Sequence, residues 1–172
     1  MKLYTLDRKN TLSEGLKISL FQFSDIQPPE LQTHLNDILP NGVTKHGDQY
    51  FASGLQSNNL GNGILELVFE YVRRAHYPDK PSRLQSLFAC NNLEDLKSFN
   101  QNYNTPGKES SIWTVETENF FRGDLKLLTF SPTALGVSYN AHRYWSGEAG
   151  SNEPFWEYLV QTPITIGKKV SP

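Results

Sequence analysis

Residues 62–76 show the clearest pattern in the sequence, that of an amphipathic α-helix. Segments before them show the alternating pattern of β-strands. Five apolar residues recur at the spacing of one face of an α-helix: Ile64, Leu67, Val68, Tyr71 and Val72. Pro78 ends this pattern. Residues 2–6 and 16–23 instead alternate between apolar and polar side chains, which is typical of β-strands. The chain therefore has to combine helices with strands in one fold.

The remaining pattern places helices early in the chain and strands around them. Further helices are predicted over 28–39 and from Asn91 or Asn92 to Phe99. Further strands are predicted over 84–89, 112–116, 125–130, 156–160 and 164–166. Because all the predicted helices lie in the first 100 residues, we expect an α+β fold and not a regular βαβ alternation. With 172 residues and no internal repeat, residues 1–172 are expected to form a single domain.

Composition excludes several classes of protein. A hydrophobic fraction of 37% and a charged fraction of 20% are typical of a folded, soluble chain. The net charge of −2 argues against a generally basic nucleic-acid-binding surface. No apolar run approaches the ~18 residues of a membrane span, and charges precede any signal-peptide-like run. We therefore expect a cytoplasmic protein that does not contact a membrane.

The familiar cofactor motifs are missing from the sequence. There is no phosphate-binding G-x-x-x-x-G-K-[ST] loop, no complete G-x-G-x-x-G and no G-x-S-x-G elbow. Cys90 is the single cysteine, so neither a disulfide within the chain nor a multi-cysteine metal site is possible. The four histidines lack paired-ligand spacing: His34, His46, His76 and His142. We expect no metal.

Polar side chains gather at the start of the predicted strand 84–89. Ser82, Arg83 and Ser86 follow a turn made rigid by prolines, and hydroxyls with a guanidinium suit phosphate or ribose oxygens. The alternative is that Ser82 caps the turn and Arg83 pairs with a surface acid.

A second candidate lies near the C-terminus. Tyr144 and Trp145 precede Glu157, a carboxylate near the beginning of an apolar strand, and such a group can stabilise a developing cation or hold a sugar hydroxyl. The alternative is that the aromatic residues belong to the core and that Glu157 faces solvent.

A third candidate is a short basic run. It comprises Arg73, Arg74, His76, Lys80 and Arg83. Such a run can grip a polyanion, or it can be a solvated helix end whose arginines pair with Glu66 and Glu70.

Taken in order, these pieces resemble a known family. The residues are Asp7-Arg8-x-Asn10-x-Leu12-x-x-Gly15, Phe69-Glu70-x-Val72-Arg73-Arg74, Ser82-Arg83-x-x-Ser86-x-Phe88-Ala89, Tyr144-Trp145-x-Gly147 and Glu157-x-Leu159. The order resembles a bacterial family of uncharacterised-domain proteins assigned to the ADP-ribosyltransferase superfamily. The resemblance implies a fold of two split antiparallel sheets with flanking helices and NAD⁺ in the cleft between the sheets.

The resemblance also implies a set of site residues. The superfamily takes a histidine or arginine from the first strand, a serine or tyrosine from the second, and a late glutamate. Carried onto this sequence, the catalytic set is Arg8, Ser86 and Glu157, because Thr5 stands where many relatives have histidine. The implied NAD⁺ contacts are Thr5, Asp7, Arg8, Ser82, Arg83, Ser86, Tyr144 and Trp145.

The implied activity is NAD⁺-dependent mono-ADP-ribosylation, as in toxins of toxin–antitoxin or phage-defence systems, which makes an antitoxin a possible partner. Cleavage of the nicotinamide–ribose bond needs no metal, because the pyridinium is already a good leaving group. We favour nucleic acid, RNA above all, as acceptor over protein, with Phe120, Phe121, Tyr139 and Trp145 available to stack an unpaired base. The alternatives are an NAD⁺ glycohydrolase and a non-catalytic NAD⁺- or nucleotide-binding or protein-interaction module.

Overall fold

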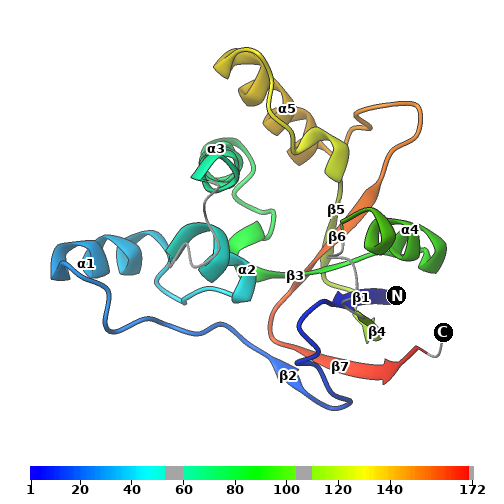
Figure 1. Cartoon of the computed structure of the whole chain (residues 1–172). Helices are drawn as coiled ribbons and strands as arrows, with labels where there is room; N and C mark the ends of the chain where they lie inside the picture. The colour runs from blue at the N-terminus through cyan, green and yellow to red at the C-terminus, as the bar shows by residue number, and fades with distance from the viewer. Residues whose placement is uncertain (53–59, 104–109, 171–172) are drawn as a thin grey trace.

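Two small antiparallel sheets form the framework of the protein. A computed structural model describes residues 1–52, 60–103 and 110–170 (Figure 1). The strands are β1 (Lys2–Asp7), β2 (Lys17–Ile18), β3 (Ser86–Ala89), β4 (Ser111–Glu116), β5 (Phe120–Asp124), β6 (Trp156–Gln161) and β7 (Ile164–Lys169). One sheet has the order β1-β4-β7-β2, and the other has the order β3-β6-β5. The predicted α+β class is confirmed.

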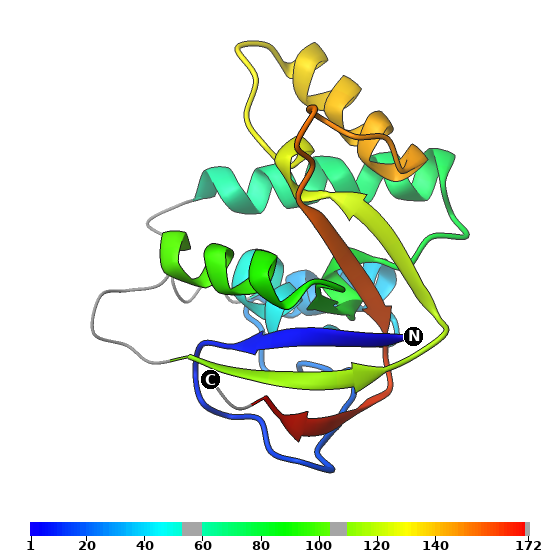
Figure 2. The same ribbon diagram turned by 90° about the vertical axis from the view of Figure 1, so that its right-hand side faces the viewer.

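Helices lie beside both sheets. The longer ones are α1 (Pro29–Ile38), α3 (Leu60–His76), α4 (Leu93–Tyr103) and α5 (Ala134–Ser146). Shorter turns are α2 (Lys45–Gly47), a π-helical turn over Asp48–Ala52, and 3₁₀ turns over Arg83–Gln85 and Leu125–Leu127. Figure 2 shows β5 and β6 extending toward α3 and α5, with β1, β4 and β7 at the opposite end of the molecule. None of the described helices is both long and apolar enough to cross a membrane.

The two sheets meet where β1 runs beside β3. Tyr4 and Cys90 exchange a pair of backbone hydrogen bonds of 2.8 Å each across this junction. The hydroxyl of Thr5 also donates to the carbonyl oxygen of Phe88 at 2.8 Å. This short pairing joins the sheets at one point and lets them diverge beyond it.

Three hydrophobic clusters fill the interior. The first lies between α3, α5 and the β5–β6 strands and contains Leu65, Phe69, Phe121, Leu127, Ala141, Tyr144, Trp145 and Leu159. The second joins the sheets and contains Leu3, Ala89, Trp113, Val115, Tyr158, Val160 and Ile166. The third lies against α1 and contains Leu35, Leu39, Val43 and Leu84.

Several predicted strands differ from the observed ones. Residues 16–23 contain only the short β2, because β7 offers it two paired residues and Phe21 makes just a single bridge, to Val43. The strand predicted over 125–130 is wrong: the carboxylate of Asp124 accepts from the backbone of Lys126 and caps a 3₁₀ turn there. The strand predicted over 84–89 begins later, at Ser86.

The expectation that helices are confined to the first 100 residues is also wrong. Helix α5 follows β5 and is capped at its start by Thr133, whose hydroxyl accepts from the backbone of Gly136 at 3.1 Å. Gly147 caps its end with a φ of +81°, which is favourable for glycine. The helices predicted over 28–39, over 62–76 and from residue 91 or 92 are confirmed as α1, α3 and α4.

Gly15 and Gly42 both have a positive φ, and comparing them tests how closely the loop before α2 packs against the chain around Phe21. Gly42 (φ +86°) and Gly15 (φ +80°) share a left-handed backbone, but a Cβ on Gly42 would lie 2.2 Å from the carbonyl oxygen of Phe21. A Cβ on Gly15 would meet no atom within 4 Å. We expect Gly15→Ala to lower the free energy of unfolding by about 1 kcal/mol and Gly42→Ala by about 2–4 kcal/mol, measured by urea denaturation. Equal losses would contradict the close approach of Gly42 to Phe21.

Candidate active site

A cavity of about 510 Å³ lies beside the junction of the two sheets. Its walls come from both sheets and from α2, α3 and α4. It is lined by Leu6, Arg8, His46, Gln49, Tyr50, Asn62, Leu65, Glu66, Arg83, Phe88, Ala89, Cys90, Leu96, Phe99, Leu125, Leu128, Phe155 and Glu157. Two carboxylates, two guanidiniums and a histidine therefore share one cavity with several aromatic rings.

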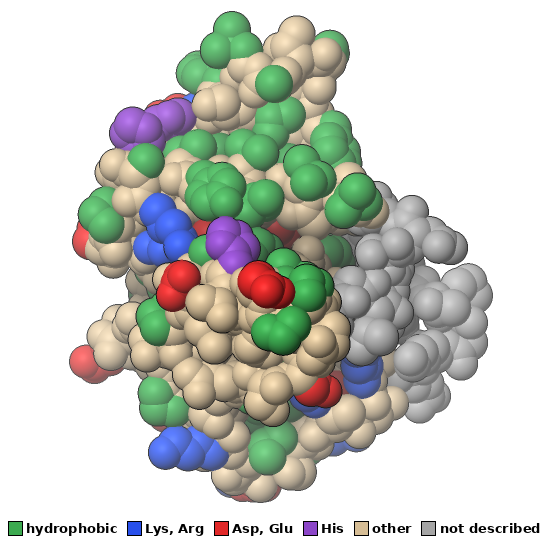
Figure 3. All heavy atoms as spheres, turned by 90° about the vertical axis from the view of Figure 1, so that its left-hand side faces the viewer, with side chains coloured by type: hydrophobic (Ala, Val, Ile, Leu, Met, Phe, Trp, Pro, Cys, Tyr) green, Lys and Arg blue, Asp and Glu red, His purple; other side chains and the backbone are tan. Residues whose placement is uncertain are grey.

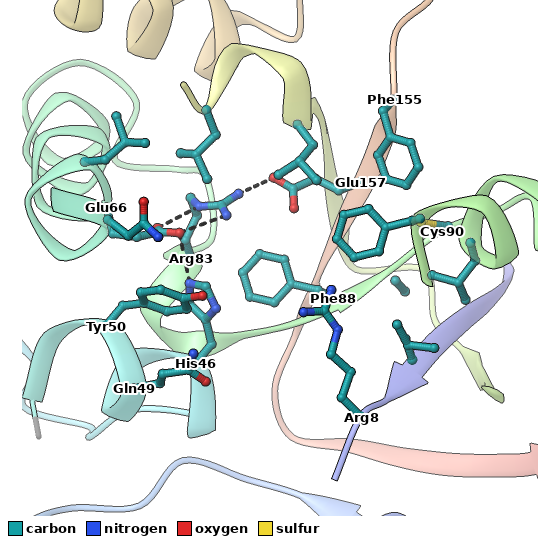
Figure 4. A pocket seen from close by; sticks show the side chains of 18 residues that line it. Arg8, His46, Gln49, Tyr50, Glu66, Arg83, Phe88, Cys90, Phe155 and Glu157 are labelled. Carbon is teal, nitrogen blue, oxygen red and sulfur yellow. Dashed lines mark hydrogen bonds and ion pairs between the residues drawn. The ribbon is translucent and has the colours of Figure 1, made fainter. Parts of the chain in front are cut away.

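A buried arginine joins the two carboxylates of this cavity. Arg83 is only 2% exposed. Its Nε and Nη2 donate to the two oxygens of Glu66 at 2.8 and 3.0 Å, a bidentate pair with α3. Its Nη1 donates to Glu157 on β6 and to the hydroxyl oxygen of Tyr144 on α5, the latter at 2.7 Å. Figure 4 shows the guanidinium between the two glutamates.

The two oxygens of Glu157 differ in their surroundings. Oε1 accepts from Arg83 and from the hydroxyl of Tyr144, the latter at 2.7 Å. Among the described residues, no hydrogen bond is made to Oε2, although the side chain lines the cavity. Oε2 is therefore the oxygen that a ligand in the cavity would meet.

Burial and charge pairing shift the proton affinities of these groups in opposite directions. Burial alone would raise the pKa of Glu66, but the charge of Arg83 and the interactions with His46 outweigh it and hold that pKa well below its ordinary value. Burial would lower the pKa of Arg83, yet Glu157 and Glu66 raise it well above its ordinary value. Burial raises the pKa of the Cys90 thiol to about 12, with Glu157 adding to the effect. Glu66 and Arg83 are therefore charged at neutral pH, and the Cys90 thiol is protonated.

A second carboxylate network lies one helical turn further along α3. Glu70 accepts from Arg73 at 2.8 and 3.0 Å, from Arg74 at 2.7 Å and from the hydroxyl of Ser82 at 2.9 Å. Burial opposes ionisation of Glu70, but the hydrogen bonds from the two arginines lower its pKa overall. Through Ser82, this network fixes the turn that carries Arg83.

The structure brings together four of the residues predicted for the site. Arg8, Arg83 and Glu157 line the cavity, and Tyr144 lies behind them, bonded through its hydroxyl to Arg83 and Glu157. Arg8 extends from the end of β1, with its guanidinium 5.0 Å from the ring centre of Phe99. The alternative that Glu157 faces solvent is wrong, because the residue is 4% exposed.

The structure places the other predicted residues in the framework instead of on the cavity wall. Thr5 bonds to the Phe88 backbone, and the Asp7 carboxylate accepts from the backbone of the following turn. Ser82 accepts from the Leu84 backbone as a cap, as the alternative for it proposed, and Ser86 donates to the carbonyl oxygen of Ser82. Trp145 is fully buried and donates to the carbonyl oxygen of Phe69. None of these five residues lines the cavity.

The basic run does not form a free patch. Arg73 and Arg74 pair with Glu70, Arg83 pairs with Glu66 and Glu157, and Lys80 pairs with Asp79 at 3.0 Å. The alternative in which the arginines pair with Glu66 and Glu70 is therefore confirmed. On the face drawn in Figure 3, Lys and Arg side chains are scattered among other types and do not form one basic surface.

The aromatic residues proposed for base stacking are dispersed as well. Phe121 and Trp145 are buried in the first hydrophobic cluster. Phe120 and Tyr139 are exposed, but neither lines the cavity. The aromatic rings that do line it are Tyr50, Phe88, Phe99 and Phe155.

Sequence reasoning missed several polar residues of the cavity, among them His46 and Glu66. His46 Nε2 lies 3.0 Å from Glu66 Oε1, and the Glu66 side chain is buried. Glu66 and Glu70 form an i, i+4 pair of acids on either side of Phe69, and the structure buries both on the side of α3 that faces the interior. Nothing in the sequence near His46 distinguishes it from the other histidines.

The fold and the site together define an α+β protein in which a buried carboxylate–guanidinium network lines a cavity between two antiparallel sheets. A family model described as "Protein of unknown function (DUF2441)" matches residues 6–172. The chain belongs to this family, since the match covers nearly its whole length. A comparison with curated proteins finds no match. Within the described ranges, no group of three or more His, Cys, Asp or Glu side chains is arranged to hold a metal ion.

The charge pairing of Glu66 predicts a defined pH dependence of stability. Its pKa is lowered on folding, so its contribution is full above the unfolded value of about 4.5 and is lost as the pH falls below it. We expect Glu66→Gln to reduce the slope of unfolding free energy against pH between roughly pH 4.5 and 2 by up to about 1.4 kcal/mol per pH unit. Denaturant melts over this range measure the slope. Glu14→Gln, at an exposed carboxylate, is the control; equal slopes for both variants would contradict the pairing.

Proposed function

We propose that the protein is an NAD⁺-dependent ADP-ribosyltransferase. One observation carries the proposal: Glu157, near the start of β6, lines a cavity at the point where β1 and β3 join the two sheets. The resemblance in the sequence implies NAD⁺ between two split sheets, with functional groups on the first strand, on the second and on a late one. In support of the proposal, Arg8 directly follows β1, Arg83 precedes β3 and Glu157 lies on β6.

The charges of the cavity suit the chemistry of nicotinamide release. The bond between nicotinamide and ribose breaks through an oxocarbenium ion, which a nearby carboxylate stabilises. Arg83 and Tyr144 hold Oε1 of Glu157 and fix the orientation of the group, and among the described residues Oε2 accepts no hydrogen bond. A second carboxylate, Glu66, shares the same arginine. Two carboxylates against one buried guanidinium give the inner wall a preference for positive charge.

Arg8 supplies the opposite charge at another part of the cavity. It is exposed, it follows β1, and its guanidinium lies over the ring of Phe99. A guanidinium in this position is suited to the pyrophosphate of NAD⁺, because it can donate two parallel hydrogen bonds. In this proposal Arg8 binds the pyrophosphate, and Glu157 acts at the ribose.

The proposed roles are narrower than the resemblance implied. Thr5 and Ser86 use their hydroxyls to hold the backbone, so the proposal assigns no catalytic step to either. Arg83 orients Glu157 from within the protein and does not contact phosphate. The proposal therefore rests on Glu157, Tyr144, Arg83 and Arg8.

The molecule that accepts the ADP-ribosyl group is proposed on different grounds from the cleavage of NAD⁺. The basic run favours an RNA acceptor in the sequence, but the structure pairs its arginines with carboxylates. Water is the acceptor in the glycohydrolase alternative, which uses the same cavity. Membership of a toxin–antitoxin or defence system, and a partner antitoxin, remain predictions from the resemblance. Nuclease and protease digestion of labelled products distinguishes RNA, DNA and protein acceptors.

The first functional prediction concerns Glu157. Purified protein is incubated with labelled NAD⁺ and bacterial lysate, and both released nicotinamide and macromolecule-bound label are measured. Glu157→Gln keeps the shape and removes the charge, so turnover should fall at least about a hundredfold. Glu148→Gln changes an exposed carboxylate paired with Arg143 outside the cavity and should leave turnover unchanged. Absence of nicotinamide release from the wild-type protein would refute the enzyme, and NAD⁺ binding without release would favour the non-catalytic module.

The second functional prediction concerns Arg8, whose exposed side chain can be replaced without disturbing the buried network. Arg8→Gln removes the proposed pyrophosphate contact. We expect KM for NAD⁺ to rise by about tenfold to a hundredfold, with a smaller effect on kcat, as for loss of a charged hydrogen bond. Lys9→Gln removes a neighbouring exposed charge and serves as the control. An unchanged KM for Arg8→Gln would exclude this role.

A further inference from the structure

A histidine and a glutamate form a pair on the wall of the cavity across from Glu157. His46 belongs to α2 and Glu66 to α3, and His46 Nε2 lies 3.0 Å from Glu66 Oε1. The imidazole is held between two rings, with its centre 4.6 Å from that of Tyr50 and 4.4 Å from that of Phe88. Figure 4 shows this pair on one side of the cavity and Glu157 on the other.

The carboxylate fixes which nitrogen of the imidazole is basic. Glu66 has a pKa well below its ordinary value, so it is ionised at neutral pH and can only accept a hydrogen bond. Nε2 of His46 must therefore carry the hydrogen that faces Glu66. In the neutral imidazole, the lone pair then lies on Nδ1. The pair is a base in a defined tautomer, with its ring orientation set by Glu66.

Glu66 can play this part because Arg83 also holds it. The guanidinium binds both oxygens of Glu66 through one edge and reaches Glu157 from Nη1. The two carboxylates are thus fixed relative to each other by one rigid, planar group. A reacting ribose beside Glu157 would share the cavity with the imidazole of His46. The acceptor would approach this ribose from the side of the cavity on which His46 lies.

We propose that His46 is the general base of the reaction and takes the proton from the acceptor nucleophile. This inference rests on the proposed transferase function. The C1′–N bond of NAD⁺ breaks with its electron pair leaving on nicotinamide, and an acceptor O–H or N–H forms the new bond to C1′. The proton that the acceptor loses goes to Nδ1 of His46 and then to solvent. Glu66 is the positioning residue.

The test compares acceptors that must lose a proton with one that has none to lose. Azide is an anionic nucleophile, so its capture of the ribosyl cation requires no general base. Labelled NAD⁺ is incubated with lysate, with or without azide, and three quantities are measured: nicotinamide, ADP-ribosyl products of water and macromolecules, and ADP-ribosyl azide. The variant is His46→Gln, because the amide N–H of glutamine can still donate to Glu66 while the basic nitrogen is lost.

We expect His46→Gln to lower formation of the water and macromolecular products by about a hundredfold, the usual contribution of a general base. Formation of ADP-ribosyl azide should stay within about twofold of the wild-type rate, because that step bypasses the base. His34→Gln, at an exposed histidine of α1 outside the cavity, should change neither product. Thermal unfolding reports whether each variant is folded, and His46→Asn replaces His46→Gln if the latter is not.

Two results overturn the inference while leaving the proposed function standing. In one, both classes of product fall together in the His46 variant, which would mean that His46 only supports the site. In the other, neither class changes. A wild-type protein that releases no nicotinamide with lysate, water or azide would instead overturn the proposed function and the role of His46 with it.

Discussion

The buried guanidinium of Arg83 is the interaction on which the rest of the structure depends. It ties the start of β3 to α3 through Glu66, to β6 through Glu157 and to α5 through Tyr144. Each of these groups is buried, so removal of the arginine would leave two carboxylates without their main partner, and an unpaired buried charge costs about 3–5 kcal/mol. The helices are therefore held against the three-stranded sheet by charge pairing as well as by the hydrophobic cluster around Phe69.

This arrangement also determines the shape of the cavity. The sheets are joined at Tyr4 and Cys90 and diverge from there, so side chains from β3, β6 and α3 face a common space. A purely apolar core would let these elements close on one another. Two carboxylates bridged by one arginine instead fix their separation, because the planar guanidinium has a set width and the glutamates bind it from different edges. Stability and site geometry thus come from the same group.

Sequence patterns predicted the elements better than the faces that the elements bury. The helix over 62–76 is confirmed, but its predicted apolar stripe is not the buried face, since Ile64 and Tyr71 are about half exposed while Glu66 and Glu70 are buried. A prediction from hydrophobic periodicity places every charged residue on the solvent-facing side of a helix. Glu66 and Glu70 are buried because residues from other segments of the chain bond to them. Helix α5 was missed although Thr133 and Gly147 mark both of its ends. Arg83 and Glu157 were found because charge beside a buried strand is unusual in itself, whereas His46 has no local signal.

The balance of charge in the cavity connects the network to what it can bind. On the inner wall two carboxyl groups, Glu66 and Glu157, share the single guanidinium of Arg83. Arg8, which is exposed, carries a positive charge at the end of β1. A ligand that is cationic at one end and anionic at the other matches both parts, and NAD⁺ has this polarity because its pyridinium and its pyrophosphate carry opposite charges. Under the proposed function, the positive charge would pass from nicotinamide to the ribose as nicotinamide leaves, and the carboxyl groups would face a cation throughout the bond-breaking step. The proposal thus accounts for two carboxyl groups around one buried guanidinium.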